Sequence, residues 1–154
     1  MLSKELFMEK ALDEAKKTNA DSIPIGCILV DSKTGNIVSR TNNNSDQKRD
    51  PFSHAEIKAL KEAADKLGHN YLNDMEIYVT IEPCLTCFSL IKSYGIKKVF
   101  FGAENKKYGF SNFINNETSF SKIKVTKNIK SKEATILLQE FFKKLREKEK
   151  NKYE

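Results

Sequence analysis

Two short stretches, thirty residues apart, constrain the fold of this chain: His54-Ala55-Glu56 and Pro83-Cys84-Leu85-Thr86-Cys87. The first supplies an imidazole and a carboxylate, and the second supplies two thiols spaced one helical turn apart. One imidazole and two thiolates with an open fourth position are typical of a catalytic zinc, whereas a structural zinc site is closed by four protein ligands. The fold must therefore bring the two stretches together, which would place Glu56 beside the metal to move protons.

The composition is that of an ordinary globular protein. The chain has 154 residues, of which 39% are hydrophobic and 31% charged, and we predict a single domain over residues 1–154. No apolar run approaches the roughly 18 residues needed to cross a bilayer, and residues 1–5 lack the pattern of a signal peptide. Three cysteines in such a chain favour metal binding or catalysis over disulfides. We expect a cytoplasmic protein with no membrane partner.

Apolar periodicity predicts helices and strands that alternate along the chain. This alternation, opened by a hairpin, predicts an α/β fold: a three-layer α/β/α sandwich with a single mixed sheet of about five strands and helices on both faces. Cys27 lies within the first strand and is predicted to be a packed core residue. The predicted elements are a helix over 3–18, a hairpin of strands 23–30 and 37–40, a helix over 53–68, a strand over 75–81, a helix over 84–94, strands over 97–101 and 123–125, and a basic helix over 131–150.

The two central helices begin at the candidate ligands. Ser53 has the residue type of an N-cap, and Glu56 three positions later would complete a capping box, which is an alternative role for that carboxylate. Cys84 and Cys87 lie at i and i+3, on one face of a first helical turn. The positive end of that helix favours their thiolate forms.

The thiol pair has two other interpretations. A thioredoxin-like redox pair leaves His54 and Glu56 without a role. A closed structural zinc could use His69 as a fourth ligand with His54, Cys84 and Cys87, since the chain has only two histidines. His69 follows the helix-ending Gly68 and is predicted to lie in an exposed loop, so we expect the open, catalytic site.

These motifs resemble the zinc-dependent cytidine deaminase superfamily, whose signature is H-x-E followed by P-C-x-x-C. Within it, the chain is most similar to the bacterial tRNA-specific adenosine deaminases. The resemblance covers nearly the whole chain and includes residues 50–57, 78–84 and 137–146. Departures include Asn105, at a loop position that is often acidic in the bacterial enzymes, and residues 109–113, which lack the usual Gly-Ser ending.

The resemblance implies a cytoplasmic homodimer that deaminates adenosine to inosine at the wobble position of a tRNA anticodon. The implied partner is a tRNA anticodon stem-loop, and DNA is not expected. The implied cofactor is one Zn²⁺ per chain, held by His54, Cys84 and Cys87, with Glu56 as the proton shuttle. Further substrate contacts are implied for Asn43, Ile23, Ala55 and Phe142.

The charge distribution bears on the substrate. Residues 122–154 hold 11 Lys/Arg against 5 Asp/Glu, and the rest of the chain holds 16 of each. The excess positive charge of residues 122–154 belongs either to a solvated helix face or to a surface that binds RNA. The predicted last helix would bury Leu137, Leu138, Phe141 and Leu145 and leave its cations exposed.

Two further functions stay open. One is deamination of a free base or nucleotide (guanine, cytosine or deoxycytidylate), against which the basic tail argues. The other is a non-catalytic, zinc-stabilised RNA-binding protein, against which Glu56 argues.

Overall fold

The computed structural model describes residues 1–44, 51–114, 120 and 122–152. Its sheet has the strand order β2-β1-β3-β4-β5. β1 runs antiparallel to both β2 and β3, whereas β3, β4 and β5 are parallel. The predicted mixed sheet with its opening hairpin is therefore confirmed. The strands are β1 (Gly26–Asp31), β2 (Ile37–Asn42), β3 (Met75–Ile81), β4 (Lys98–Ala103) and β5 (Lys124–Thr126).

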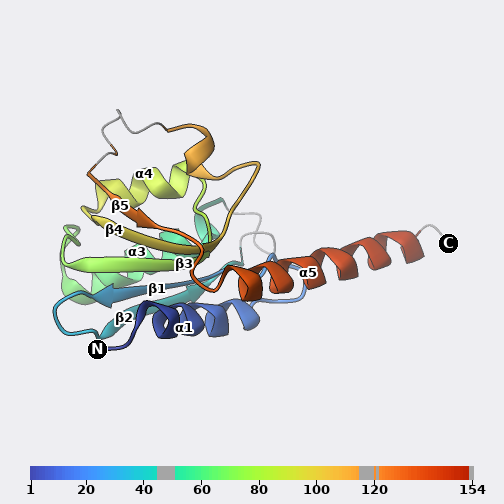
Figure 1. Cartoon of the computed structure of the whole chain (residues 1–154), viewed down its shortest axis with the longest axis horizontal. Coiled ribbons are helices and arrows are strands. Elements are labelled where there is room, and N and C mark those ends of the chain that lie inside the picture. Colours follow the sequence, from blue (N-terminus) through green and yellow to red (C-terminus); the bar gives the residue numbers. More distant parts are fainter. Residues whose placement is uncertain (45–50, 115–119, 121, 153–154) are drawn as a thin grey trace.

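Helices cover both faces of this sheet, which confirms the three-layer sandwich (Figure 1). α1 (Lys4–Lys16) and α5 (Ser131–Lys152) contribute to one apolar core, and α3 (Ala55–Leu67) and α4 (Leu85–Ser93) contribute to the other. Successive residues of a strand point to opposite faces. In β1, accordingly, Cys27 belongs to the α3/α4 core and Ile28 to the α1/α5 core, and both are fully buried. Cys27 is thus a packed core residue, as predicted.

β1 is shorter than predicted and begins at Gly26 rather than at residue 23. Pro24 has no backbone N–H to give to a sheet. The N–H of Gly26 instead donates to the Thr80 hydroxyl at 3.1 Å. The preceding residues 23–25 are consequently outside the strand.

α3 starts one residue later than predicted. His54, not Ser53, is its N-cap, and Ser53 ends a short 3-10 helix, η1 (Pro51–Ser53). The predicted capping box is therefore wrong. The Thr41 hydroxyl on β2 donates to the Ala55 carbonyl at 2.6 Å, which ties the first turn of α3 to the sheet. The helix ends, as predicted, at Gly68, whose φ of 75° suits glycine.

α5 extends well past the body of the protein (Figure 1). A helix of 22 residues is about 33 Å long, whereas the six residues of β4 span only about 20 Å. Ala134 is buried, Leu137 and Phe141 are half-buried, and Leu145 is 40% exposed. The prediction that Leu145 would be buried is wrong because the sheet ends before the helix does.

Within the described part of the chain, no helix combines the length and the apolar character needed to span a bilayer.

Candidate active site

The starts of two helices bring the predicted zinc ligands together. His54 is the N-cap of α3, Cys84 is the N-cap of α4, and Cys87 lies in the first turn of α4. Their ligand atoms all lie within 4.8 Å of one another. Sγ of Cys87 is 3.5 Å from Nδ1 of His54. A tetrahedral zinc with ordinary bond lengths separates a sulfur and a nitrogen ligand by about 3.5 Å, so these residues fit the metal.

The local electrostatics favour the thiolate form of Cys84 over that of Cys87. A hydrogen bond from the Cys87 thiol, followed by one from His54, lowers the pKa of Cys84 to about 4 despite partial burial. The same shared proton, together with burial, raises the pKa of Cys87. Both sulfurs also lie at the positive end of α4. The pair is therefore ready to exchange its remaining proton for a metal cation.

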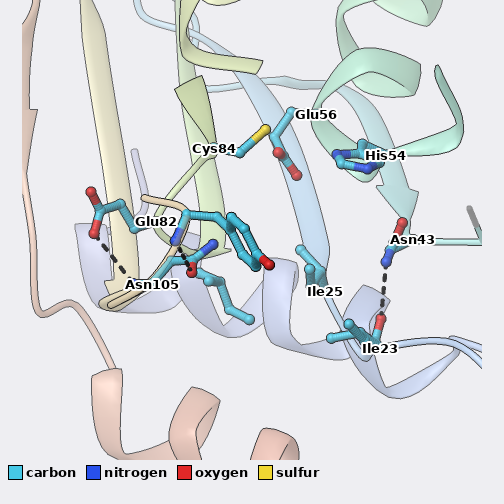
Figure 2. Close-up of a pocket in the computed structure, with 10 residues that line it drawn as sticks. Ile23, Ile25, Asn43, His54, Glu56, Glu82, Cys84 and Asn105 are labelled. Atoms are coloured by element: carbon cyan, nitrogen blue, oxygen red, sulfur yellow. Dashed lines mark hydrogen bonds between the residues drawn. The ribbon is translucent and has the colours of Figure 1, made fainter. Parts of the chain in front are cut away.

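Glu56 lies beside these ligands. It is the second residue of α3, and its side chain is only 5% exposed. Figure 2 shows it between Cys84 and His54, with its carboxylate directed into the pocket. Burial is the main cause that raises the pKa of Glu56 above its usual value. A buried carboxyl group directed at a metal site is suited to accept a proton and return it.

The pocket in front of Glu56 has a volume of about 360 Å³, within the size range of small-ligand sites. Ile23 and Asn43 line it, and the Asn43 side-chain amide donates to the Ile23 carbonyl at 3.4 Å. Ala55 is fully buried at the start of α3, and Phe142 is 40% exposed on α5; neither is among the residues that line this pocket. The structure thus brings Ile23 and Asn43 to the metal ligands and leaves Phe142 outside the pocket.

His69 is exposed, and it is not part of the ligand group that forms in the described chain. The structure therefore does not bring His69 to the other three residues, as a closed four-ligand zinc site would require.

The sequence analysis assigned no substrate contact to the wall of the pocket that faces Ile23 and Asn43. Asn105 and Tyr108, from the segment after β4, line the pocket together with Glu82, which follows β3. One signal could have found them, because ligands of α/β sheets bind outside the carboxyl ends of parallel strands. Residues 82 and 105 follow two adjacent parallel strands.

Comparisons with known proteins agree with this geometry. Residues 1–103 match the family model described as "Cytidine and deoxycytidylate deaminase zinc-binding region". The tRNA-specific adenosine deaminase of Aquifex aeolicus is 39% identical over 150 residues, which are 94% of this chain and 97% of the relative. A solved structure from a study of A-to-I editing by tRNA:A34 deaminases is 29% identical with a TM-score of 0.77, covering 88% of this chain and 100% of that one. The guanine deaminase of Nitrosomonas europaea shares the fold, with a TM-score of 0.82 at 21% identity over 92% of this chain and 85% of that one.

Proposed function

Because the chain belongs to the cytidine and deoxycytidylate deaminase zinc-binding family, we propose that it is a zinc-dependent hydrolase that converts adenosine to inosine at the wobble position of a tRNA anticodon. The observation that carries this proposal is the convergence of His54, Cys84 and Cys87 with the buried Glu56 at one pocket. The near full-length similarity to a tRNA-specific adenosine deaminase supports the choice of substrate.

The chemistry follows from the groups present. When bound, zinc supplies a Lewis acid that makes water nucleophilic at neutral pH. Glu56 takes a proton from the attacking water and delivers it to N1 of the adenine ring while the oxygen bonds to C6. Glu56 then takes the remaining proton from the new C6 hydroxyl and passes it to the amino group, the C6–N bond breaks, and inosine and ammonia are the products. The burial that raises the pKa of Glu56 supports both its basic and its acidic role.

The pocket is suited to a nucleotide that has been turned out of its strand. Ile23 and Ile25 offer an apolar flank, and Asn43 offers an amide close to His54 (Figure 2). Ala55 opens α3, and the first N–H groups of a helix have no partner within it, so its backbone is suited to donate to the substrate. In this proposal Phe142, on the surface of α5, stacks on a neighbouring base of the anticodon loop instead of the target base.

The basic helix is proposed to hold the anticodon stem-loop. Lys143, Lys144 and Arg146 are exposed in the second half of α5. Such a row of cations is suited to the phosphates of RNA. We also propose a cytoplasmic homodimer. The support for the homodimer is that two large apolar side chains close to the metal ligands in the sequence, Phe52 and Leu85, are 60% and 37% exposed.

The test uses the purified, zinc-loaded protein and four kinds of substrate: anticodon stem-loops with adenosine at the wobble position, the same stem-loops with guanosine there, free guanine or cytosine, and deoxycytidylate. Inosine and ammonia are measured for each. We expect both products from the adenosine stem-loop only. Ammonia from guanine, cytosine or deoxycytidylate without inosine in RNA would contradict the proposal, as would tight RNA binding with no turnover.

A further inference from the structure

Glu82 occupies an unusual place between the metal ligands and the pocket wall. It follows β3 and precedes Pro83-Cys84, and its side chain is only 3% exposed. One carboxylate oxygen, Oε1, accepts the backbone N–H of Asn105 at 3.2 Å, and the other, Oε2, accepts that of Ser111 at 3.0 Å. The two oxygens therefore hold the two ends of one segment, residues 105–111, which we call the wall loop.

The middle of the wall loop lies directly against the same stretch. The N–H of Phe110 donates to the Pro83 carbonyl at 2.9 Å, and Gly109 forms an isolated antiparallel bridge with Cys84. This approach requires glycine, because a Cβ at position 109 would meet the carboxyl group of Glu82 and lie 2.5 Å from the Asn105 carbonyl oxygen. The wall loop is thus bonded directly to the stretch that carries the ligand Cys84.

The wall loop carries the side of the pocket that faces Asn43 and Ile23 (Figure 2). Asn105 and Tyr108 both line the pocket. The Asn105 side-chain oxygen accepts the N–H of Tyr108 at 3.1 Å, so a shift of one moves the other. The carboxylate of Glu82 therefore joins both ends of this wall to the stretch that carries Cys84.

We infer that Glu82 is a positioning residue for the deamination: its carboxylate holds Asn105 and Tyr108 at the distance from the metal ligands that a nucleoside requires. This inference rests on the proposed function. A carboxylate is needed because it presents two acceptor oxygens, whereas the amide of glutamine presents one acceptor and one donor. In a glutamine variant, one end of the wall loop would face an N–H group where it needs an oxygen.

The first test compares Glu82→Gln with Glu104→Gln. The control removes the same charge from the residue directly after β4, whose side chain is 52% exposed and whose Oε1 lies 4.0 Å from Nζ of Lys127. For Glu82→Gln, KM for the adenosine stem-loop should rise about tenfold or more, as expected for the loss of a charge-assisted hydrogen bond. The kcat value should stay within about twofold, and zinc content should remain one per chain. Glu104→Gln should match the native protein.

The second test asks whether Glu82 acts through the wall loop. In a double-mutant cycle, Tyr108→Ala and Glu82→Gln should each raise KM, and the double variant should be little worse than the poorer single variant. Additive effects would overturn the inference. Gly109→Ala should raise KM in the same way, because it displaces the same loop without removing a charge.

A third measurement needs no substrate. Amide hydrogen exchange of Asn105 and Ser111 should be faster in Glu82→Gln than in Glu104→Gln, since both N–H groups donate to Glu82. Unchanged exchange would overturn the inference even if the native protein deaminated none of the substrates offered. A native protein without turnover would contradict the proposed function alone. Loss of zinc from Glu82→Gln would overturn the inference by showing that Glu82 supports the metal ligands rather than the wall.

Discussion

Sγ of Cys87 lies 3.5 Å from Nδ1 of His54, although 33 positions separate the two residues in the chain. Each belongs to a different helix start, and both helices pack on the same face of the sheet. The metal centre is therefore assembled between two N-termini, whose partial positive charges favour thiolates and carboxylates over cationic groups. The effects of substituting each of these groups can be predicted from this arrangement.

The zinc content should depend on Cys87 and not on His69. Cys87→Ala removes one of three convergent ligands and should leave the purified protein with little zinc. His69→Gln alters an exposed residue outside the ligand group and should keep one zinc per chain, as measured by metal analysis. A His69→Gln protein without zinc would mean that His69 is the fourth ligand of a closed site.

Glu56 should be needed for turnover but not for metal binding. Glu56→Ala removes the group proposed to move protons and should lower kcat by about 100-fold or more, the typical contribution of general acid–base catalysis. Zinc content and RNA affinity should be retained. If turnover per folded molecule were unchanged and only the melting temperature fell, Glu56 would be a structural residue of α3.

Cations on α5 should determine RNA affinity. Reversing the charges of Lys143, Lys144 and Arg146 should weaken stem-loop binding strongly and reduce its salt dependence, because fewer counterions are released from the RNA. Zinc content should not change. Deleting residues 148–154 removes only one net positive charge and should have a modest effect.

A matched control for those cations lies at the amino end of β4, away from the active site. Lys92, Lys97 and Lys122 are exposed there and line a separate hollow. Reversing these three charges changes the net charge equally and should affect binding much less. Equal losses in the two triple variants would indicate that total charge, rather than α5, attracts the RNA.

The projecting end of α5 should contribute little to stability. Leu145 is 40% exposed, whereas Leu60 on α3 is fully buried. Leu60→Ala should therefore cost about 2–5 kcal/mol of unfolding free energy, and Leu145→Ala should stay within roughly 1 kcal/mol. Chemical denaturation measures both. A large cost at Leu145 in the isolated protein would show that this end of the helix is covered, for example by a second subunit.

The metal ligands could be predicted from the sequence because their signal is local. The spacing of Cys84 and Cys87 by itself places two thiols on one helical face, and the glycine after α3 predicts an exposed His69. The strand Met75–Ile81 was predicted with its observed bounds, since a buried β-branched and aromatic run ended by Glu-Pro has few other structures to adopt.

Other features depended on contacts between segments distant in the sequence. Ser53 has the residue type of an N-cap, but the tertiary structure gives that position to His54, whose imidazole is required at the metal. Apolar spacing in α5 predicted that Leu145 would be buried. Its burial depends on how far the sheet extends beneath the helix, and the periodicity of the helix gives no information about that length. The role of Glu82 is of the same kind. A glutamate before a proline says nothing about the N–H groups of Asn105 and Ser111, which only the packing of β3 beside β4 brings to its carboxylate. Local spacing thus determined the chemistry of the metal ligands, and the tertiary structure decided which residues form the pocket around them, because those residues meet only when the strands pair.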